Sequence, residues 1–326
     1  MKLTAQNILK ITLPLLLGGA ILFWMYRDFD FHAAKQVVTK EMNWWWMIIS
    51  LPFGIMAQAF RGWRWRQSLE PTGEHPRKST CVNAIFLSYA VSLIIPRVGE
   101  FARCAVLKRQ DKVSFPKALG TVVTERAIDT MLVMTITALV IVSQMNIFRR
   151  FFSSTDTDFS KMLQNFSWEG YMVTAACGII ALAFIYFLIR RMTIFDKVKM
   201  TAKGLFEGII SLRKVKNIPL FILFTLGIWV SYFIHYYLTF FCFEATSHLG
   251  LTCALVTFIV GSIAVIVPTP NGAGPWHFAV KTMLILYGVA DTDALYFVLI
   301  VHTVQTLLVV LLGIYAWTRL SLQKKI

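Results

Sequence analysis

Charged residues are scarce in this sequence, and no hydrophilic stretch is long enough to form a separate soluble domain. Only 15% of its 326 residues are Asp, Glu, Lys or Arg, whereas 57% are hydrophobic and gather in long blocks. The longest polar connections between these blocks are roughly 20 to 28 residues, too short to build a core of their own. The composition therefore excludes a soluble globular protein and predicts an all-α polytopic membrane protein.

Cysteine is also rare, and its spacing excludes two kinds of site. The five cysteines stand singly: Cys81, Cys104, Cys177, Cys242 and Cys253. Isolated cysteines in apolar segments pack as small hydrophobic residues, so we predict neither a disulfide framework nor a structural zinc site. The membrane histidines His235, His277 and His302 lie on different segments without an HExxH motif, so we predict buried imidazoles and no metal site.

Motifs of nucleotide and acyl-transfer chemistry are missing as well. The chain has no P-loop, no GxGxxG and no GxSxG, and we expect no cofactor. Three Asp-x-Asp patterns, at 28–30, 156–158 and 291–293, leave open a membrane glycosyltransferase that holds a divalent cation beside a sugar phosphate. Such patterns are common by chance. All three are predicted on the outer face, where only a lipid-phosphate sugar donor would suit them.

What the chain does have is a large excess of positive charge, +15 at neutral pH. No basic domain with a nucleic-acid recognition fold is visible, so we expect no nucleic-acid partner. In a membrane protein the excess is typical of cytoplasmic loops that touch anionic lipids. We therefore expect membrane lipids, with anionic headgroups, as the partners. The oligomeric state is left open.

The hydropathy pattern predicts six full spans and two re-entrant helical hairpins in a single domain over residues 1–326. The full spans are 8–26, 44–60, 118–144, 170–189, 219–243 and 295–317, the first of them retained rather than cleaved. The hairpins lie near 81–108 in a first half (1–145) and near 252–289 in a second half (169–318). The basic stretch 190–217 predicts an amphipathic helix on the inner membrane surface.

The distribution of Lys and Arg fixes the predicted orientation. Most of the 32 Lys and Arg fall on one side if both termini are cytoplasmic, which predicts a multi-pass protein of a bacterial-type inner membrane. The first hairpin then enters from inside and the second from outside, as in an inverted repeat. A hairpin that turns back inside the membrane and one that crosses it twice both return the chain to the side from which it entered. The sequence therefore leaves both possibilities open.

The first hairpin contains a polar break that interrupts the apolar pattern. Pro96 ends the apolar piece, and Arg97, Gly99, Glu100 and Arg103 follow. On a helix the three charged residues share roughly one face, so Glu100 would pair with one arginine and hold the other toward an anion. The N-terminus of the new half-helix adds N–H groups and a positive dipole end. A simple ion-paired hinge is the alternative.

The second break, near 268–276, supplies a similar environment without charge. Asn271, Gly272 and Gly274 allow a sharp turn and close backbone approach, and Pro275 suits the first turn of the next half-helix. His277 lies on that half-helix. The two breaks have similar lead sequences, Ile-Ile-Pro and Ile-Val-Pro, and we predict that they form two halves of one site.

Two further groups of charged residues lie in or next to the spans. Glu125, Arg126 and Asp129 lie within the third span, where ionisable side chains must face protein or water, and the spacing allows Arg126 to pair with Asp129. They form either a structural ion cluster or a cavity wall that directs an arginine to a headgroup. Arg61 and Arg64 close the second span, either as an interfacial anchor or as a headgroup-binding platform.

These motifs together resemble a known family. The patterns Arg61-x-x-Arg64-Trp65, Pro96-Arg97-x-Gly99-Glu100-x-x-Arg103, Glu125-Arg126-x-x-Asp129 and the 268–274 loop are similar to the lysylphosphatidylglycerol synthase transmembrane region, or flippase-like domain, over nearly the whole chain. The resemblance implies a polytopic lipid-handling protein, as in the flippase half of the multiple peptide resistance factor.

Two departures from the family pattern bear on function. The aminoacyl-transfer domain of the synthase is absent, so we do not expect this chain to make lysyl-lipid. His277 stands where family members often carry an acid, which removes the basis for a coupling role at that position. The leading hypothesis is a translocase for an anionic phospholipid or lipid-linked phosphate rather than an enzyme. A glycosyltransferase with a lipid-phosphate donor, or a non-catalytic assembly factor, is the alternative.

Overall fold

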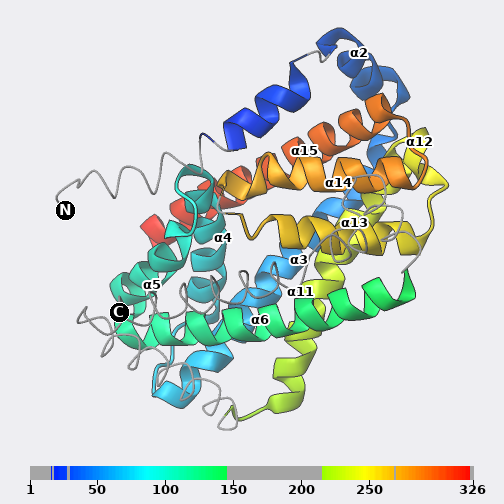
Figure 1. Ribbon diagram of the computed structural model, residues 1–326. Helices are drawn as coiled ribbons and strands as arrows, with labels where there is room; N and C mark the ends of the chain where they lie inside the picture. The colour runs from blue at the N-terminus through cyan, green and yellow to red at the C-terminus, as the bar shows by residue number, and fades with distance from the viewer. Residues whose placement is uncertain (1–15, 17, 28–29, 145–214, 268, 324–326) are drawn as a thin grey trace, which may run out of the picture.

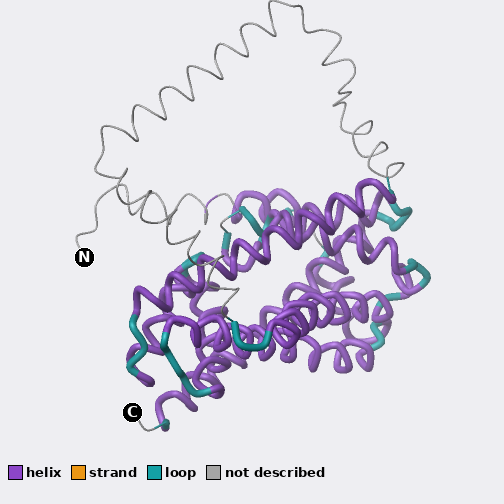
Figure 2. The backbone as a smooth tube through the Cα atoms, turned by 90° about the horizontal axis from the view of Figure 1, so that it is seen from below, coloured by secondary structure: helices purple, strands orange, loops and turns teal. Residues whose placement is uncertain are grey.

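The computed structural model describes residues 16, 18–27, 30–144, 215–267 and 269–323, and every regular element among them is helical (Figures 1 and 2). The predicted span 170–189, the predicted surface helix 190–217 and most of the first predicted span lie outside these residues. Residues 18–26 of that first span are helical.

Long apolar helices form the frame of the molecule. In the described part of the chain, three are long and apolar enough to cross a membrane: α6 (Phe115–Ser143), α11 (Ile218–Leu238) continued by η4 (Thr239–Cys242), and α15 (Asp291–Leu322). Large apolar side chains are exposed along all three, including Leu139, Val142, Ile222, Leu223, Leu311 and Ile314. Continuous exposed apolar surface of this kind suits contact with lipid.

The second predicted span is longer than its hydropathy indicated. Helix α3 (Trp44–Leu69) begins at Asn43, whose side chain accepts a hydrogen bond from the Trp45 N–H, and continues nine residues beyond the predicted end at residue 60. Its final turns carry Arg61 and Arg64, which are buried. The helix therefore continues because these charges find partners inside the protein, as described below.

The first polar break joins two helices into a hairpin. Helix α4 (Lys78–Ile94) precedes the break and α5 (Val98–Asp111) follows it. At the open end, Arg77 donates hydrogen bonds from its backbone N–H (2.9 Å) and its Nε (2.7 Å) to the Asp111 carboxylate. The start of α4 and the end of α5 therefore lie side by side, and the two helices run antiparallel.

The second break joins α13 (Leu251–Ala264) to α14 (Pro275–Leu286), with the short helix η5 (Pro270–Gly272) between them. Val256 and Ile259 of α13 pack on Met283 of α14 in one apolar cluster. Helix α14 also packs on α15, so α13, α14 and α15 lie side by side in Figure 1. Both predicted interruptions are therefore real, and each connects two short helices.

Short elements close the two ends of the molecule. They are α2 (Phe31–Gln36), the π-helical turn η1 (Val37–Glu41), η2 (Glu70–Thr72) and α12 (Glu244–Ser247). At one end Gln110 Nε2 donates to the Leu320 carbonyl (2.6 Å), and at the other the Asn43 N–H donates to the Cys242 carbonyl (2.9 Å). These bonds hold the ends of α5 and α15 together at one end of the molecule, and the start of α3 and the end of η4 at the other.

Candidate anion site where two helix breaks meet

The two breaks, far apart in the sequence, meet in space. Arg97 Nη2, in the first break, donates a hydrogen bond to the Ile266 carbonyl in the second (3.1 Å). Helix η5, inside the second break, also contacts α4, which leads into the first. The structure therefore brings together the two segments that the sequence analysis paired.

The backbone of the first break places Arg97 at the start of α5. Arg97 has φ 66°, in the left-handed region that a residue other than glycine seldom adopts, and it is the N-cap of α5 without a side-chain cap. Its side chain is exposed. The helix N-terminus next to it carries a partial positive charge, so guanidinium and helix dipole favour an anion at the same place.

Gly99 sets how closely the two helices of this hairpin approach. A Cβ at this position would lie 1.9 Å from the Ser88 carbonyl oxygen and 2.3 Å from Ser92 Oγ. No side chain fits there, so only glycine lets the first turn of α5 rest on the last turns of α4. Gly99 thus acts through the backbone and positions Arg97 and Glu100 on either side of it.

The second break is fixed to α15 by side-chain hydrogen bonds. Asn271 Nδ2 donates to Thr306 Oγ1 (2.8 Å), and His302 Nε2 lies 3.1 Å from the Asn271 carbonyl oxygen. Asn271, Gly272 and Gly274 all have positive φ values, 51°, 73° and 90°. Gly274 immediately precedes α14, just as the left-handed Arg97 immediately precedes α5. Both half-helices therefore begin directly after a residue with positive φ.

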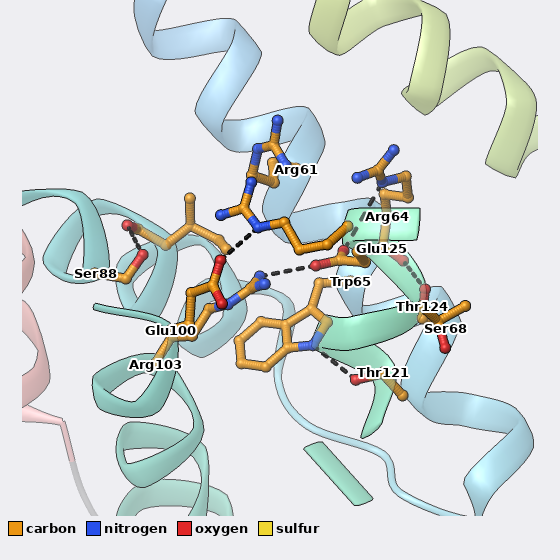
Figure 3. Close-up of polar contacts among 12 residues, drawn as sticks. Arg61, Arg64, Trp65, Ser68, Ser88, Glu100, Arg103, Thr121, Thr124 and Glu125 are labelled. Carbon is orange, nitrogen blue, oxygen red and sulfur yellow. Dashed lines mark hydrogen bonds and ion pairs between the residues drawn. The ribbon is translucent and has the colours of Figure 1, made fainter. Parts of the chain in front are cut away.

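A buried ion cluster joins α3, α5 and α6, and Figure 3 shows Arg61, Arg64, Arg103 and Glu125 of this cluster. Asp129 of α6 accepts a hydrogen bond from Arg61 (2.6 Å) and forms an ion pair with Arg64 (2.8 Å), both on α3. Glu125, one turn earlier, accepts from Arg103 of α5 (2.9 Å). These bonds join α3, α5 and α6, and the five side chains are almost fully buried.

Trp65 supports this cluster and was not among the predicted site residues. The Arg103 guanidinium carbon lies 4.6 Å from the centre of the buried Trp65 ring, and Trp65 Nε1 donates to Thr121 Oγ1 (2.9 Å). Arginine stacked on an indole gains a cation–π attraction that grows when water is excluded. The Arg-x-x-Arg-Trp spacing was a usable signal, because Arg61 and Trp65 lie four residues apart on one helix face.

The cluster has one more positive than negative charge. Its three arginines face two carboxylates, and four guanidinium nitrogens have no hydrogen-bond acceptor among the described residues: Arg61 Nε, Arg64 Nε, Arg64 Nη2 and Arg103 Nη2. An unmatched charge is costly to bury. The local arrangement therefore favours a nearby anion.

The pairing within this region differs from the pairing predicted along single helices. Glu100 accepts from Arg126 Nε at 2.5 Å, not from Arg97 or Arg103. Asp129 binds the two arginines of α3, and Arg126 is turned away from it toward α5. The predicted pairs were wrong because sequence spacing reveals only neighbours on one helix, whereas α3, α5 and α6 supply closer partners across their contacts.

The structure bears on one of the two interpretations of the α3 arginines, the interfacial anchor. The exposed fraction is 4% for Arg61 and 0% for Arg64, so neither is an interfacial anchor. Trp63, on another face of the same turn, is 38% exposed and fits that role. Arg64 reaches further toward α11, where its Nη1 lies 3.4 Å from Thr225 Oγ1.

Those aspartates of the Asp-x-Asp patterns that are considered next have structural roles in the described part of the chain. Asp30 accepts from the backbone N–H groups of His32 (2.8 Å) and Ala33 (3.0 Å) as the N-cap of α2, and these bonds lower its pKa. Asp291 pairs with Lys281 (2.8 Å). The pattern at 156–158 lies outside the described residues. Within the described ranges, no three His, Cys, Asp or Glu side chains gather in a way that would hold a metal ion.

Comparison with known proteins assigns the chain to a family. The family model described as lysylphosphatidylglycerol synthase TM region matches residues 11–313, which include both breaks and the whole ion cluster. The chain belongs to this family. No curated protein and no solved structure matches it. Membership in the lysylphosphatidylglycerol synthase TM family makes it a membrane protein with a lipid-related function.

Proposed function

We propose that this protein binds the phosphate of an anionic phospholipid or lipid-linked phosphate where the two breaks meet, and translocates that lipid across the membrane. The observation that carries the proposal is the contact of Arg97 with the Ile266 carbonyl, which joins both breaks at an exposed guanidinium. Two interrupted helices that meet with their polar ends are the arrangement in which transporters bind charged substrates.

The accessible and buried arginines have different roles in this proposal. Arg97 and Arg126 are exposed, and Arg126 pairs with Glu100 near the start of α5, so these two arginines are the groups that would contact phosphate. Arg103 is buried, as are Arg61 and Arg64. It would act through its positive charge and by fixing α5 against α3 and α6. The sequence analysis left open which of Arg97 and Arg103 would face the anion, and the burial of Arg103 argues for a positioning role.

The short helices support re-entrant hairpins. At about 1.5 Å per residue, α5, α13 and α14 are roughly 18 to 21 Å long, and α4 is about 26 Å. A hydrocarbon core of about 30 Å is thicker than each of these. The proposal therefore includes six full spans and two hairpins that enter the bilayer from opposite faces of a bacterial-type inner membrane.

The decisive experiment replaces Arg97 without changing its backbone. Arg97→Asn keeps a residue that tolerates positive φ and removes the charge. In reconstituted liposomes we expect transfer of a labelled anionic phospholipid between leaflets to fall at least about tenfold, the loss expected for one bond between charged groups. Lys112→Asn is the matched control, because Lys112 is also exposed and left-handed (φ 54°) at the other end of α5.

Unchanged lipid transfer by a folded Arg97→Asn protein would contradict the proposal. The glycosyltransferase alternative predicts instead sugar transfer that needs a divalent cation and is lost in Asp30→Asn. Asn is as good an N-cap as Asp, so that variant leaves α2 intact. An assembly factor would keep its cellular role after both Arg97 and Arg126 are removed.

A further inference from the structure

A separate cavity lies between the helix at residues 18–26, the start of α14 and α15. Its volume is about 580 Å³, and its walls include Leu22, Phe23, Arg27, His277, Leu299 and Thr303. None of the arginines and carboxylates of the ion cluster lines it. Phe23 is 76% exposed, so the cavity opens beside an apolar surface that would face hydrocarbon.

Hydrogen bonds in the second break fix the ring proton of His302. A carbonyl oxygen only accepts, so His302 Nε2 donates to the Asn271 carbonyl (3.1 Å). His302 Nδ1 then accepts from Thr306 Oγ1 (3.4 Å), which in turn accepts from Asn271 Nδ2 (2.8 Å). This closed ring occupies both nitrogens of His302.

His277, by contrast, keeps a donor for the cavity. Its Nδ1 accepts from the Gly274 N–H (3.4 Å), so the neutral ring carries its proton on Nε2. No described residue accepts from Nε2, although the side chain is only 3% exposed and lines the cavity. Its ring centre lies 4.4 Å from that of His302, which restricts its rotation.

We propose that this cavity binds the phosphate head and the first part of one acyl chain of a phosphate-bearing lipid, as a second site apart from Arg97. His277 Nε2–H and the Thr303 hydroxyl would donate to the phosphate. The positive end of the twelve-residue helix α14 favours an anion there. Leu22, Phe23 and Leu299 offer an apolar wall for the chain. The volume is that of an ordinary ligand pocket.

The test uses the purified full-length protein and a phosphatidic acid with a photoactivatable group on one acyl chain. We expect crosslinks in residues 18–27 and 299–306, and we expect dihexanoyl phosphatidic acid to compete for them. Thr303→Val and His277→Phe should each weaken that competition about tenfold, as the loss of one hydrogen bond to a charged group does. Each variant is first checked for folding by its thermal transition.

Leu299→Trp tests the cavity without touching a polar group. It should abolish the crosslinks by filling the space, whereas Leu307→Trp, at a 55% exposed position on the same helix, should leave them unchanged. Crosslinks that persist in folded Leu299→Trp would overturn the proposal. Equal competition by dihexanoylglycerol would reveal an apolar groove only, and full competition by inorganic phosphate alone would reveal a free-phosphate site. Either result would also overturn it.

The Arg97→Asn protein separates this inference from the proposed function. Its crosslinks should equal those of the wild-type protein, even though its lipid transfer falls. If the Arg97→Asn protein transfers lipid at the wild-type rate and its crosslinks are intact, the proposed translocation route is overturned and the second site is still supported. Loss of the crosslinks in folded Arg97→Asn would overturn the claim that the two sites are separate.

Discussion

Asp129 forms ion pairs with two arginines at once, and this makes the ion cluster respond unequally to the loss of an acid and of a base. Asp129→Asn leaves three buried positive charges against one negative charge. Arg61→Met leaves a neutral set in which Asp129 still pairs with Arg64. Removing the carboxylate of a buried ion pair is strongly destabilising here, because it leaves more positive charge buried without a partner.

We therefore expect Asp129→Asn to lower the free energy of unfolding by about 3–5 kcal/mol and Arg61→Met to lower it by clearly less. Thermal transitions of the two variants in one detergent compare them directly. Arg61→Met should also reduce lipid transfer, because it removes the surplus positive charge of the cluster. Equal destabilisation by the two variants would show that the charge imbalance is not what matters.

The charged side chains of the ion cluster could be predicted from the sequence, but the residues with which they pair could not. Every charged residue of the cluster was a candidate, because ionisable groups in apolar segments are costly and therefore informative. The pairs Arg61–Asp129, Arg103–Glu125 and Arg126–Glu100 all cross between helices. No spacing rule within one helix can predict which faces of α3, α5 and α6 meet.

Among the elements, the α4–α5 hairpin depends most on a single residue. Gly99→Ala would place a methyl group 1.9 Å from the Ser88 carbonyl, a backbone atom that cannot move aside cheaply. We expect it to destabilise the protein by about 3 kcal/mol or more, or to part the two helices. Gly120→Ala on α6 is the control, because nothing lies within 4 Å of its Cβ position.

The control substitution should be neutral or stabilise by up to about 1 kcal/mol, because alanine favours a helix. Denaturation of both variants, followed by thermal transition and by protease cleavage near residues 95–97, measures the difference. A Gly99→Ala protein as stable as Gly120→Ala would mean that the close approach of α4 and α5 is not needed.

Element boundaries were predictable where a backbone signal marked them. Pro96 and the Pro-Gly loop near 270–275 gave both breaks to within a few residues, because proline and glycine act locally on the chain. The end of α3 was placed too early, since hydropathy treats arginines as a boundary. Buried partners on α6 and α11 override that rule, and they become visible only when the helices are packed.

For the whole molecule, charge separates the two ends of the helix bundle. The end at which Lys117 Nζ donates to the Thr72 carbonyl (2.8 Å) carries Arg66, Arg77, Lys78, Lys108, Arg109, Lys112 and Arg319. The other end carries Asp30, Glu41, Glu244, Asp291 and Asp293, with fewer basic residues. This asymmetry was readable from the sequence, because short basic loops stay cytoplasmic. The meeting of the two breaks was only inferred from their similar lead sequences.

The same asymmetry predicts which residues a membrane-impermeant thiol reagent reaches. Lys40→Cys and Lys108→Cys are matched changes at exposed lysines on opposite ends. They are introduced into a chain with Cys177→Ser, which keeps the other four cysteines because all are buried. In intact spheroplasts we expect a charged maleimide to label Lys40→Cys and to reach Lys108→Cys only after permeabilisation. The reverse pattern would invert the orientation, and with it the side from which a lipid headgroup meets Arg97.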